Sequence, residues 1–277
     1  AFNARINVKL ADWASITVSG SRRTPGFGTL EQRINSRSRE EINQFDIAGN
    51  FQMGKFFPAK WGIEIPVYLT YGQRIVKPQY NPLESDVEMV NYLQEFETPH
   101  IRDSIKNSVM DFSEQKSISF NNIRHVRVAK QPQAGNNPDK GAPGVSSAPK
   151  THPWDIANFS LSYSYTQTYS HNATVESRWQ TGHRGALNYS YTFTNKPIEF
   201  FKNAKKKNII TAVNFNPLPK QIGFSIQGDR QFEENQIRQT AGIQVIKPTY
   251  FKNFLVTRNY NLRWDLTKGL SFNYTAT

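Results

Sequence analysis

Apolar and polar residues alternate along much of this chain, and the alternation is clearest in its last two dozen residues. Between residues 254 and 266 every second position is apolar, with Arg258 as the exception, and the intervening positions are mostly Asn, Thr, Arg and Asp. After residues 267–269 the pattern resumes with Leu270, Phe272 and Tyr274. Because successive side chains of a strand point to opposite faces, these residues predict an antiparallel hairpin with one apolar and one polar face.

The same period predicts ten strands in the whole chain. They are expected at residues 6–10, 14–18, 41–53, 63–71, 118–128, 159–165 and 187–193, from residue 222 into 229–238, and at 253–266 and 270–276. Pro66 lacks a ladder donor and predicts a bulge or a distorted edge, and Asn121-Asn122 interrupts the fifth strand as a bulge would. Residues 86–93 have the spacing of a short helix.

The connections fall into two groups if the chain crosses ten times. The turns at residues 11–13 and 267–269 share a side with the turn near Pro58 and with segments 131–153 and 195–220. The opposite side receives segments 22–39, 77–115, 171–182 and 238–250. Segment 131–153 is rich in Pro, Gly, Ala, Ser and Asn and is expected to be flexible, whereas 195–220 is rich in lysine.

Composition makes a membrane-barrel wall the best interpretation of this pattern. Only 37% of the residues are hydrophobic, yet 13% are aromatic, and the mean hydropathy is −0.63. A barrel wall combines a polar, water-facing side with aromatic girdles, which accounts for both the low hydrophobic fraction and the high aromatic fraction. No run reaches the 18 to 20 apolar residues of a spanning helix, which excludes a helical membrane protein. The first five residues do not resemble a secretory signal, so we expect a mature chain or a piece of one.

The residues that usually carry chemistry are missing or scattered. There is no cysteine, which removes disulfides, thiolate metal sites and cysteine nucleophiles. The adjacent carboxylates Glu40-Glu41 and Glu233-Glu234 would face opposite ways on a strand, which makes them poor acid–base partners. None of the five histidines has the spacing of a metal pair: His100, His125, His152, His171 and His183. We therefore expect no enzyme activity, no cofactor and no metal site.

The net charge of +12 has several possible explanations. It suits nucleic-acid binding, attraction to an acidic surface, a charged lumen, or simply solvated loops. Single-strand binding needs basic and stacking groups on one surface. Around Tyr260 and Trp264 the aromatics share the apolar face while Arg263 lies on the other. Packing against lipid or a core is therefore favoured, and no nucleic-acid partner is expected.

Several segments, in this order, resemble the SprA/Sov family, the giant outer-membrane barrel of the type 9 secretion system of Bacteroidetes, whose members also act in gliding motility. The resemblance covers most of the chain. This sequence departs from the family pattern at Glu84-Ser85-Asp86 and in length, since family members are many times longer, and it therefore looks like a fragment of the full protein. The residues that carry it are Pro58, Pro66, Pro78, Tyr80, Asn81, Pro82, Asp86, Asn216, Pro217, Pro219, Arg258, Tyr260, Trp264, Leu266 and Lys268.

The resemblance implies an all-β fold in which residues 1–277 form about ten strands of a much larger transmembrane barrel. Segment 77–115 would be a folded extracellular-side insertion and 195–220 a periplasmic-side connection. The apolar positions would face lipid or form the aromatic girdle, with these as candidates: Phe51, Phe159, Tyr163, Tyr189, Tyr191, Leu262, Trp264, Phe272 and Tyr274. The implied partners are the rest of the barrel, outer-membrane lipid, cargo with a C-terminal signal, a lateral PorV-like barrel and a periplasmic plug.

Two other functions fit the pattern of residues. A complete small porin or uptake channel of about ten strands is allowed by the even number of crossings. A secreted β-rich module that binds glycans through exposed Tyr and Trp is the third hypothesis. Heat-modifiable migration of a refolded barrel would support the former, and a soluble monomer without detergent would support the latter.

Overall fold

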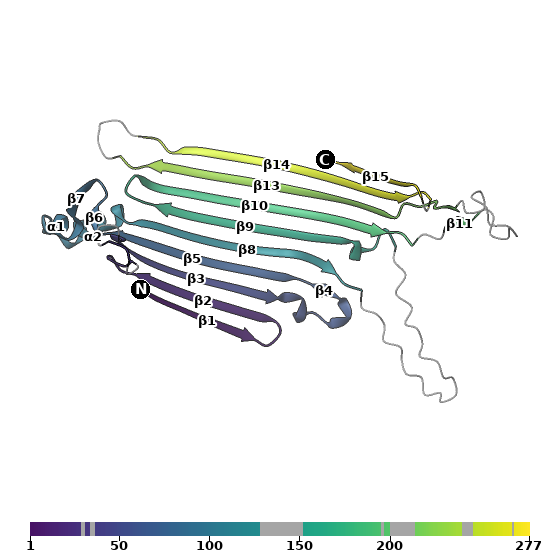
Figure 1. Cartoon of the computed structure of the whole chain (residues 1–277), viewed down its shortest axis with the longest axis horizontal. Coiled ribbons are helices and arrows are strands. Elements are labelled where there is room, and N and C mark those ends of the chain that lie inside the picture. Colours follow the sequence, from purple (N-terminus) through teal and green to yellow (C-terminus); the bar gives the residue numbers. More distant parts are fainter. Residues whose placement is uncertain are drawn as a thin grey trace, which may run out of the picture.

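The computed structural model describes residues 1–28, 31–33, 37–127, 152–194, 197–199, 214–239, 246–267 and 269–277. Eleven strands of the described residues form one antiparallel sheet (Figure 1). Along the sheet they are β1 (Phe2–Leu10), β2 (Ala14–Arg23), β3 (Glu40–Gln52), β5 (Pro66–Pro78), β8 (Asp111–His125), β9 (Phe159–His171), β10 (Val175–Thr192), β13 (Gln221–Ile237), β14 (Thr249–Asp265) and β15 (Ser271–Ala276), with β4 (Ile63–Glu64) beside β8. The all-β antiparallel prediction is confirmed, including the ten strands of its main path.

Short elements cluster at the two ends of the strands. One end carries the hairpin of β6 (Tyr80–Asn81) and β7 (Glu84–Glu88), followed by helices α1 (Met89–Gln94) and α2 (Pro99–Val109). The other end carries the 3-10 turns η2 (Met53–Phe56), η3 (Ala59–Trp61) and η4 (Ile156–Asn158), and the pair of β11 (Ile198–Glu199) and β12 (Asn214–Phe215). We call these the helix end and the turn end of the sheet (Figure 1).

The interruptions predicted from Asn122 and Pro66 are both present. The register of β8 with β9 shifts between Phe120 and Ile123, and Asn122 has a positive φ of 58°. Its backbone N–H donates to Ser162 Oγ at 2.9 Å. The strand expected at 63–71 is broken at Ile65 into β4 and β5, because Pro66 has no N–H with which to continue the ladder.

Some strand ends differ from the prediction. Residues 171–182 are not a connection: β9 runs to His171, β10 starts at Val175, and only residues 172–174 form the turn. Likewise, β5 and β8 extend into both ends of segment 77–115, which leaves 79–110 between them. Near the helix end both faces of the strands are polar, so the period of two vanishes although the strands continue.

Helix α2 was missed by the sequence prediction, which placed one helix at residues 86–93. The structure has α1 close to that position and a second, longer helix after it. Its sequence signal is Thr98-Pro99, since proline is favoured in the first turn of a helix. No helix among the described residues is long and apolar enough to cross a membrane.

Two of the predicted connections can be compared only in part. In segment 131–153 only residues 152 and 153 belong to the described chain. In segment 195–220, residues 195–196 and 200–213 lie outside it, while β11, β12 and residues 216–220 lie within it.

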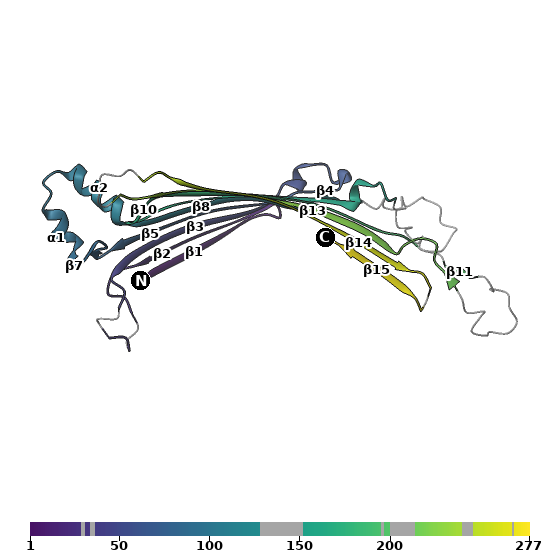
Figure 2. The same ribbon diagram turned by 90° about the horizontal axis from the view of Figure 1, so that it is seen from above.

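The sheet is twisted and thin. Viewed from above, β1 and its neighbours diverge from β14 and β15 on either side of the centre, as expected for the right-handed twist of strands (Figure 2). The buried apolar side chains of the described residues are few, and four of them, Val76, Met89, Val109 and Ala173, lie near the helix end. There is no second layer over the sheet among the described residues, so its faces are its surfaces.

Candidate functional surface

The cross-strand register assigns every strand residue to one of two faces, because directly opposed residues point the same way. One unbroken row crosses nine strands and serves as a reference for height. It consists of Ile6, Val18, Ile47, Tyr71, Lys116, Gln167, Thr181, Phe232 and Lys252. We call the face that this reference row shares with Leu69, Ile118 and Leu187 the apolar face, and the other the polar face.

The apolar face exposes large side chains. Exposed fractions reach 61% for Ile6, 48% for Leu161 and 48% for Phe272. Patches of this kind on a soluble monomer rarely exceed a few hundred Å², so an apolar sheet face spanning ten strands indicates a surface that meets a non-aqueous phase or another molecule. All nine of the predicted lipid-facing or girdle residues lie on this face: Phe51, Phe159, Tyr163, Tyr189, Tyr191, Leu262, Trp264, Phe272 and Tyr274.

Aromatic side chains form a row of their own across this face. The ring of Phe159 in β9 lies 4.8 Å from that of Tyr189 in β10, which lies 5.5 Å from Phe224 in β13. Phe224 is directly opposite Tyr260 of β14. Nearer the helix end, Tyr169 and Trp179 pack at 4.4 Å. Aromatic rings at two heights are the arrangement of the girdles at the two interfaces of membrane barrels.

The polar face carries mainly hydroxyl, amide and paired charged groups. One of its rows reads Thr17, Ala48, Thr70, Ser117, Thr166, Gly182, Gln231. Arg184 and Asp229 form an ion pair at 2.7 Å, and Arg178 pairs with Glu233 at 2.8 Å. These pairs neutralise charge locally and leave a hydrated surface rather than a site for chemistry.

A polar border crosses the apolar face obliquely. On each strand we take the first polar residue met when moving from the apolar band toward the helix end. In sheet order these border residues are Arg22, Asn43, Gln73, Lys116, Gln167, His183, Arg230 and Arg258. Relative to the reference row, Arg22 in β2 lies four residues toward the helix end, whereas Arg258 in β14 lies six residues toward the turn end.

This drift gives the angle between the border and the cross-strand rows. It amounts to about ten residues over seven strand-to-strand steps, which is about 33 Å along the strands against about 34 Å across them. A band of constant height would therefore require strands tilted by about 45° from the normal to the band. Strands of membrane barrels tilt by roughly 35–45°, so the apolar band has the slope that such a wall would give it.

Two motif segments far apart in the sequence meet at the turn end. The indole N–H of Trp264 donates to the carbonyl oxygen of Asn216 at 2.9 Å. In return, the Asn216 side-chain amide donates to the Asp265 carbonyl at 2.6 Å and its backbone N–H to that of Leu266 at 2.9 Å. Lys220 adds an ion pair with Asp265 at 3.1 Å. Pro217 and Pro219 follow Asn216 in this clamp, and Lys268 lies outside the described residues.

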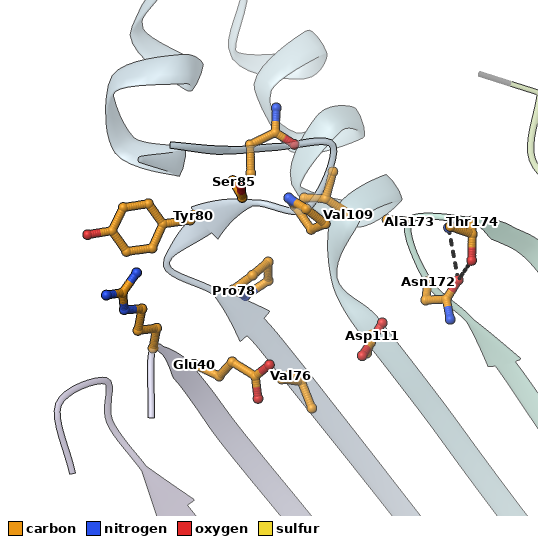
Figure 3. A pocket seen from close by; sticks show the side chains of 13 residues that line it. Glu40, Val76, Pro78, Tyr80, Ser85, Val109, Asp111, Asn172, Ala173 and Thr174 are labelled. Atoms are coloured by element: carbon orange, nitrogen blue, oxygen red, sulfur yellow. Dashed lines mark hydrogen bonds between the residues drawn. The ribbon is translucent and has the colours of Figure 1, made fainter. Parts of the chain in front are cut away.

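A second motif lines a pocket at the helix end, on the polar face (Figure 3). Its volume is about 440 Å³, and Pro78, Tyr80, Asn81 and Pro82 contribute to its wall. Asn81 is buried, and its side-chain oxygen accepts the N–H of Leu83 at 3.1 Å. The remaining lining residues include Arg39, Glu40, Val76, Ser85, Val109, Asp111 and Ala173.

The other motif residues occupy separate positions. Pro58 precedes η3, Pro66 is the first residue of β5, and Asp86 lies exposed in β7. Tyr260 is on the apolar face, and Arg258 is on the polar border. The family motifs thus form two local structures, the clamp at Asn216 and the pocket at Tyr80, and do not converge on one site.

Outside the strands, one titratable group has a clear environment. The Asp155 carboxylate accepts the backbone N–H of His152 at 2.9 Å and pairs with Arg127 at 2.8 Å. These contacts, the first being the larger, lower the pKa of Asp155 below its ordinary value. Sequence reasoning did not find this turn, because Arg127 and Asp155 are brought together only by the fold.

Arg258 on the apolar face can be recognised from the alternation in the sequence, whereas Arg230 and Lys252 cannot. Each of them is a cation at a position where the alternation would place an apolar residue. The face on which it lies can be assigned only from the strand register.

The structure is a long antiparallel sheet with one apolar and one polar face, and its motifs hold local structure together. Combined with the family comparison, it defines a motility- or secretion-related class of protein. Residues 1–93, which span β1 to β7 and most of α1, match the SprA_N family, described as a motility related/secretion protein. This match supports membership of the SprA/Sov family. No curated protein matches the chain.

Proposed function

We propose that this chain forms part of the pore wall of the outer-membrane translocon of the type 9 secretion system. The wall passes folded cargo proteins with C-terminal sorting signals to the cell surface. The family match supports a secretion or motility role. The oblique polar border is the observation that carries the finer proposal.

The border favours a membrane over a covering protein layer because its slope matches a flat slab crossed by tilted strands. The height of the band gives a second argument. Arg258 and Thr267, which lies just beyond the end of β14 at Asp265, are nine residues apart. At the rise of a strand this is about 30 Å, or about 21 Å along the membrane normal at 45°. Barrel proteins have an apolar band of about 25 Å.

In this arrangement the polar face lines the lumen. Rows of Ser, Thr, Asn and Gln with paired charges make up much of the surface that a passing protein would meet, and exposed Phe251, Leu255 and Arg74 lie on the same face. The wall needs no catalytic group, and transport through it is passive. We propose accordingly that the chain is not an enzyme.

The partners follow from the position in the wall. The sheet continues into the rest of the giant barrel, its apolar face meets outer-membrane lipid, and its polar face meets cargo. Segment 77–115 lies on the extracellular side and 195–220 on the periplasmic side. A lateral PorV-like barrel and a periplasmic plug protein complete the assembly.

The face assignment is tested with Leu262 and Asn261, which are adjacent in β14 and lie on opposite faces. In the full-length protein, L262R should cost roughly 2–4 kcal/mol of stability in the bilayer, and N261R should be tolerated. The amount of folded protein in the outer membrane is the readout. Equal tolerance of both substitutions would contradict the assignment.

The role in translocation is tested by crosslinking. A photoreactive amino acid at Ser117, on the polar face, should capture cargo during secretion, whereas the same residue at Ile118 should capture lipid. Cargo captured from Ile118 but not from Ser117 would exclude a polar lumen.

A further inference from the structure

Three cations lie at or just beyond the polar border on the last long strands. Arg230 of β13, and Lys252 and Arg258 of β14, all lie on the apolar face and are exposed. Arg258 and Arg230 are border residues, and Lys252 follows toward the helix end. Arg230 and Lys252 are therefore positioned where an apolar phase would give way to water. Arg258 lies closer to the apolar band, with Val256 and Phe254 between it and Lys252 on the same face.

These cations lack the carboxylate partners that their counterparts have. On the polar face of β10 and β14, Arg178, Arg184 and Arg263 each contact an acidic side chain at 2.7–3.5 Å. Within the described residues, none of Arg230, Lys252 and Arg258 has a carboxylate within 4.0 Å. Glu234 lies on the same face, two residues beyond Phe232 in β13. Their charge is available to an external anion.

The surroundings select a particular kind of anion. Arg230 is directly opposite Phe254, which is 69% exposed, and the Lys252 ammonium lies 5.7 Å from the Phe232 ring. Arg230 and Lys252 occupy diagonal positions, where backbones are about 7–8 Å apart, close enough for both long side chains to reach one tetrahedral group. A fully hydrated anion would gain nothing from the phenyl rings, whereas an amphiphile would cover them.

We infer that Arg230, Lys252 and Arg258 form a binding surface for the phosphate groups of anionic lipids in the leaflet at the helix end. Arg230 and Lys252 hold one phosphate, Arg258 engages a second, and Phe232 and Phe254 contact the adjoining acyl or glycerol region. Arginine and lysine are the usual ligands of phosphate, and each basic residue beside a membrane adds about fivefold to anionic-lipid binding. This inference rests on the proposed membrane location of the apolar face.

The test uses the full-length protein in phosphatidylcholine vesicles with and without diphosphoryl lipid A. Native mass spectrometry of the extracted protein gives the ratio of bound lipid A to bound phosphatidylcholine. The variant R230Q/K252Q should lower this ratio by more than tenfold, and R258Q by about fivefold. R74Q removes an exposed arginine from the polar face of β5 and should leave the ratio unchanged.

Two further measurements distinguish failure of the phosphate-binding proposal from failure of the proposed membrane location. Quenching of tryptophan fluorescence by brominated phosphatidylcholine reports whether the apolar face meets lipid, using W264F to isolate the contribution of Trp264. Quenching without a lipid A preference overturns the phosphate surface alone, and absence of quenching overturns the membrane location as well. Inorganic phosphate at the same molar phosphorus content should not compete, and full competition would make free phosphate, not lipid, the ligand.

Discussion

The indole nitrogen of Trp264 and the carbonyl oxygen of Asn216 are joined by a 2.9 Å hydrogen bond, although 48 residues separate them in the chain. The bond holds the end of β14 to the segment that follows β12. With the return bonds from Asn216 to the carbonyls of Asp265 and Leu266, it fixes where the hairpin of β14 and β15 turns.

The substitution W264F should therefore loosen the turn. It removes the N–H donor and leaves the Asn216 carbonyl without that partner, at a cost of about 1 kcal/mol. Hydrogen exchange at Thr267, whose N–H is bonded to Leu270 O, should accelerate about fivefold. W154F, at an indole that is 76% exposed, is the matched control, and the same acceleration there would show that the clamp has no role.

Residues in one cross-strand row should respond differently to charge. Ile47 in β3 and Thr181 in β10 both belong to the reference row. Because the border drifts, Ile47 lies inside the apolar band and Thr181 beyond it. I47R should cost roughly 2–4 kcal/mol, and T181R at most about 1 kcal/mol. Resistance of the membrane-embedded protein to urea measures the difference, and equal costs would remove the evidence for tilt.

The bulge in β8 depends on a left-handed residue. Asn122 has φ of 58°, a conformation that asparagine and glycine adopt most readily. N122V should destabilise the sheet locally by about 1–2 kcal/mol, whereas N122G should be close to neutral. Exchange rates of the β8 and β9 amides give the measurement, and N121V is the control. If N122V is as well tolerated as N122G, the bulge is not set by this residue.

The turn before β9 should open in acid. Because its contacts lower the pKa of Asp155, the ionised carboxylate stabilises the turn fully at pH values above the ordinary aspartate pKa of 3.8. That contribution is lost as the pH falls through the lowered pKa. Protection of the His152 amide, which donates to Asp155 Oδ2, should decline over this range. In D155N the decline should be absent, and an unchanged pH profile in that variant would point to another group.

The sequence predicts this fold well where the two faces differ and poorly where they do not. In β9, apolar Leu161, Tyr163 and Tyr165 alternate with serines, so strand and face are both recognisable. In β10, His183 lies on the same face as Leu187 at the border and Thr181 lies beyond it, so residues 175–182 resemble a loop. The bulge at Asn122 was predicted because a local break in alternation is visible in the sequence. The partners of Asn216 and of Asp155 were not, because contacts between distant segments have no local pattern.

The drift of the border also has a consequence for the other side of the sheet. Cross-strand rows of hydroxyl and amide groups on the polar face run perpendicular to the strands, since both faces share one backbone register, and they are therefore inclined to the border by the same angle. In a closed wall these rows would follow a helical path around the interior. A folded cargo protein moving straight through would cross one row after another and would not follow a single continuous row of hydrogen-bonding groups.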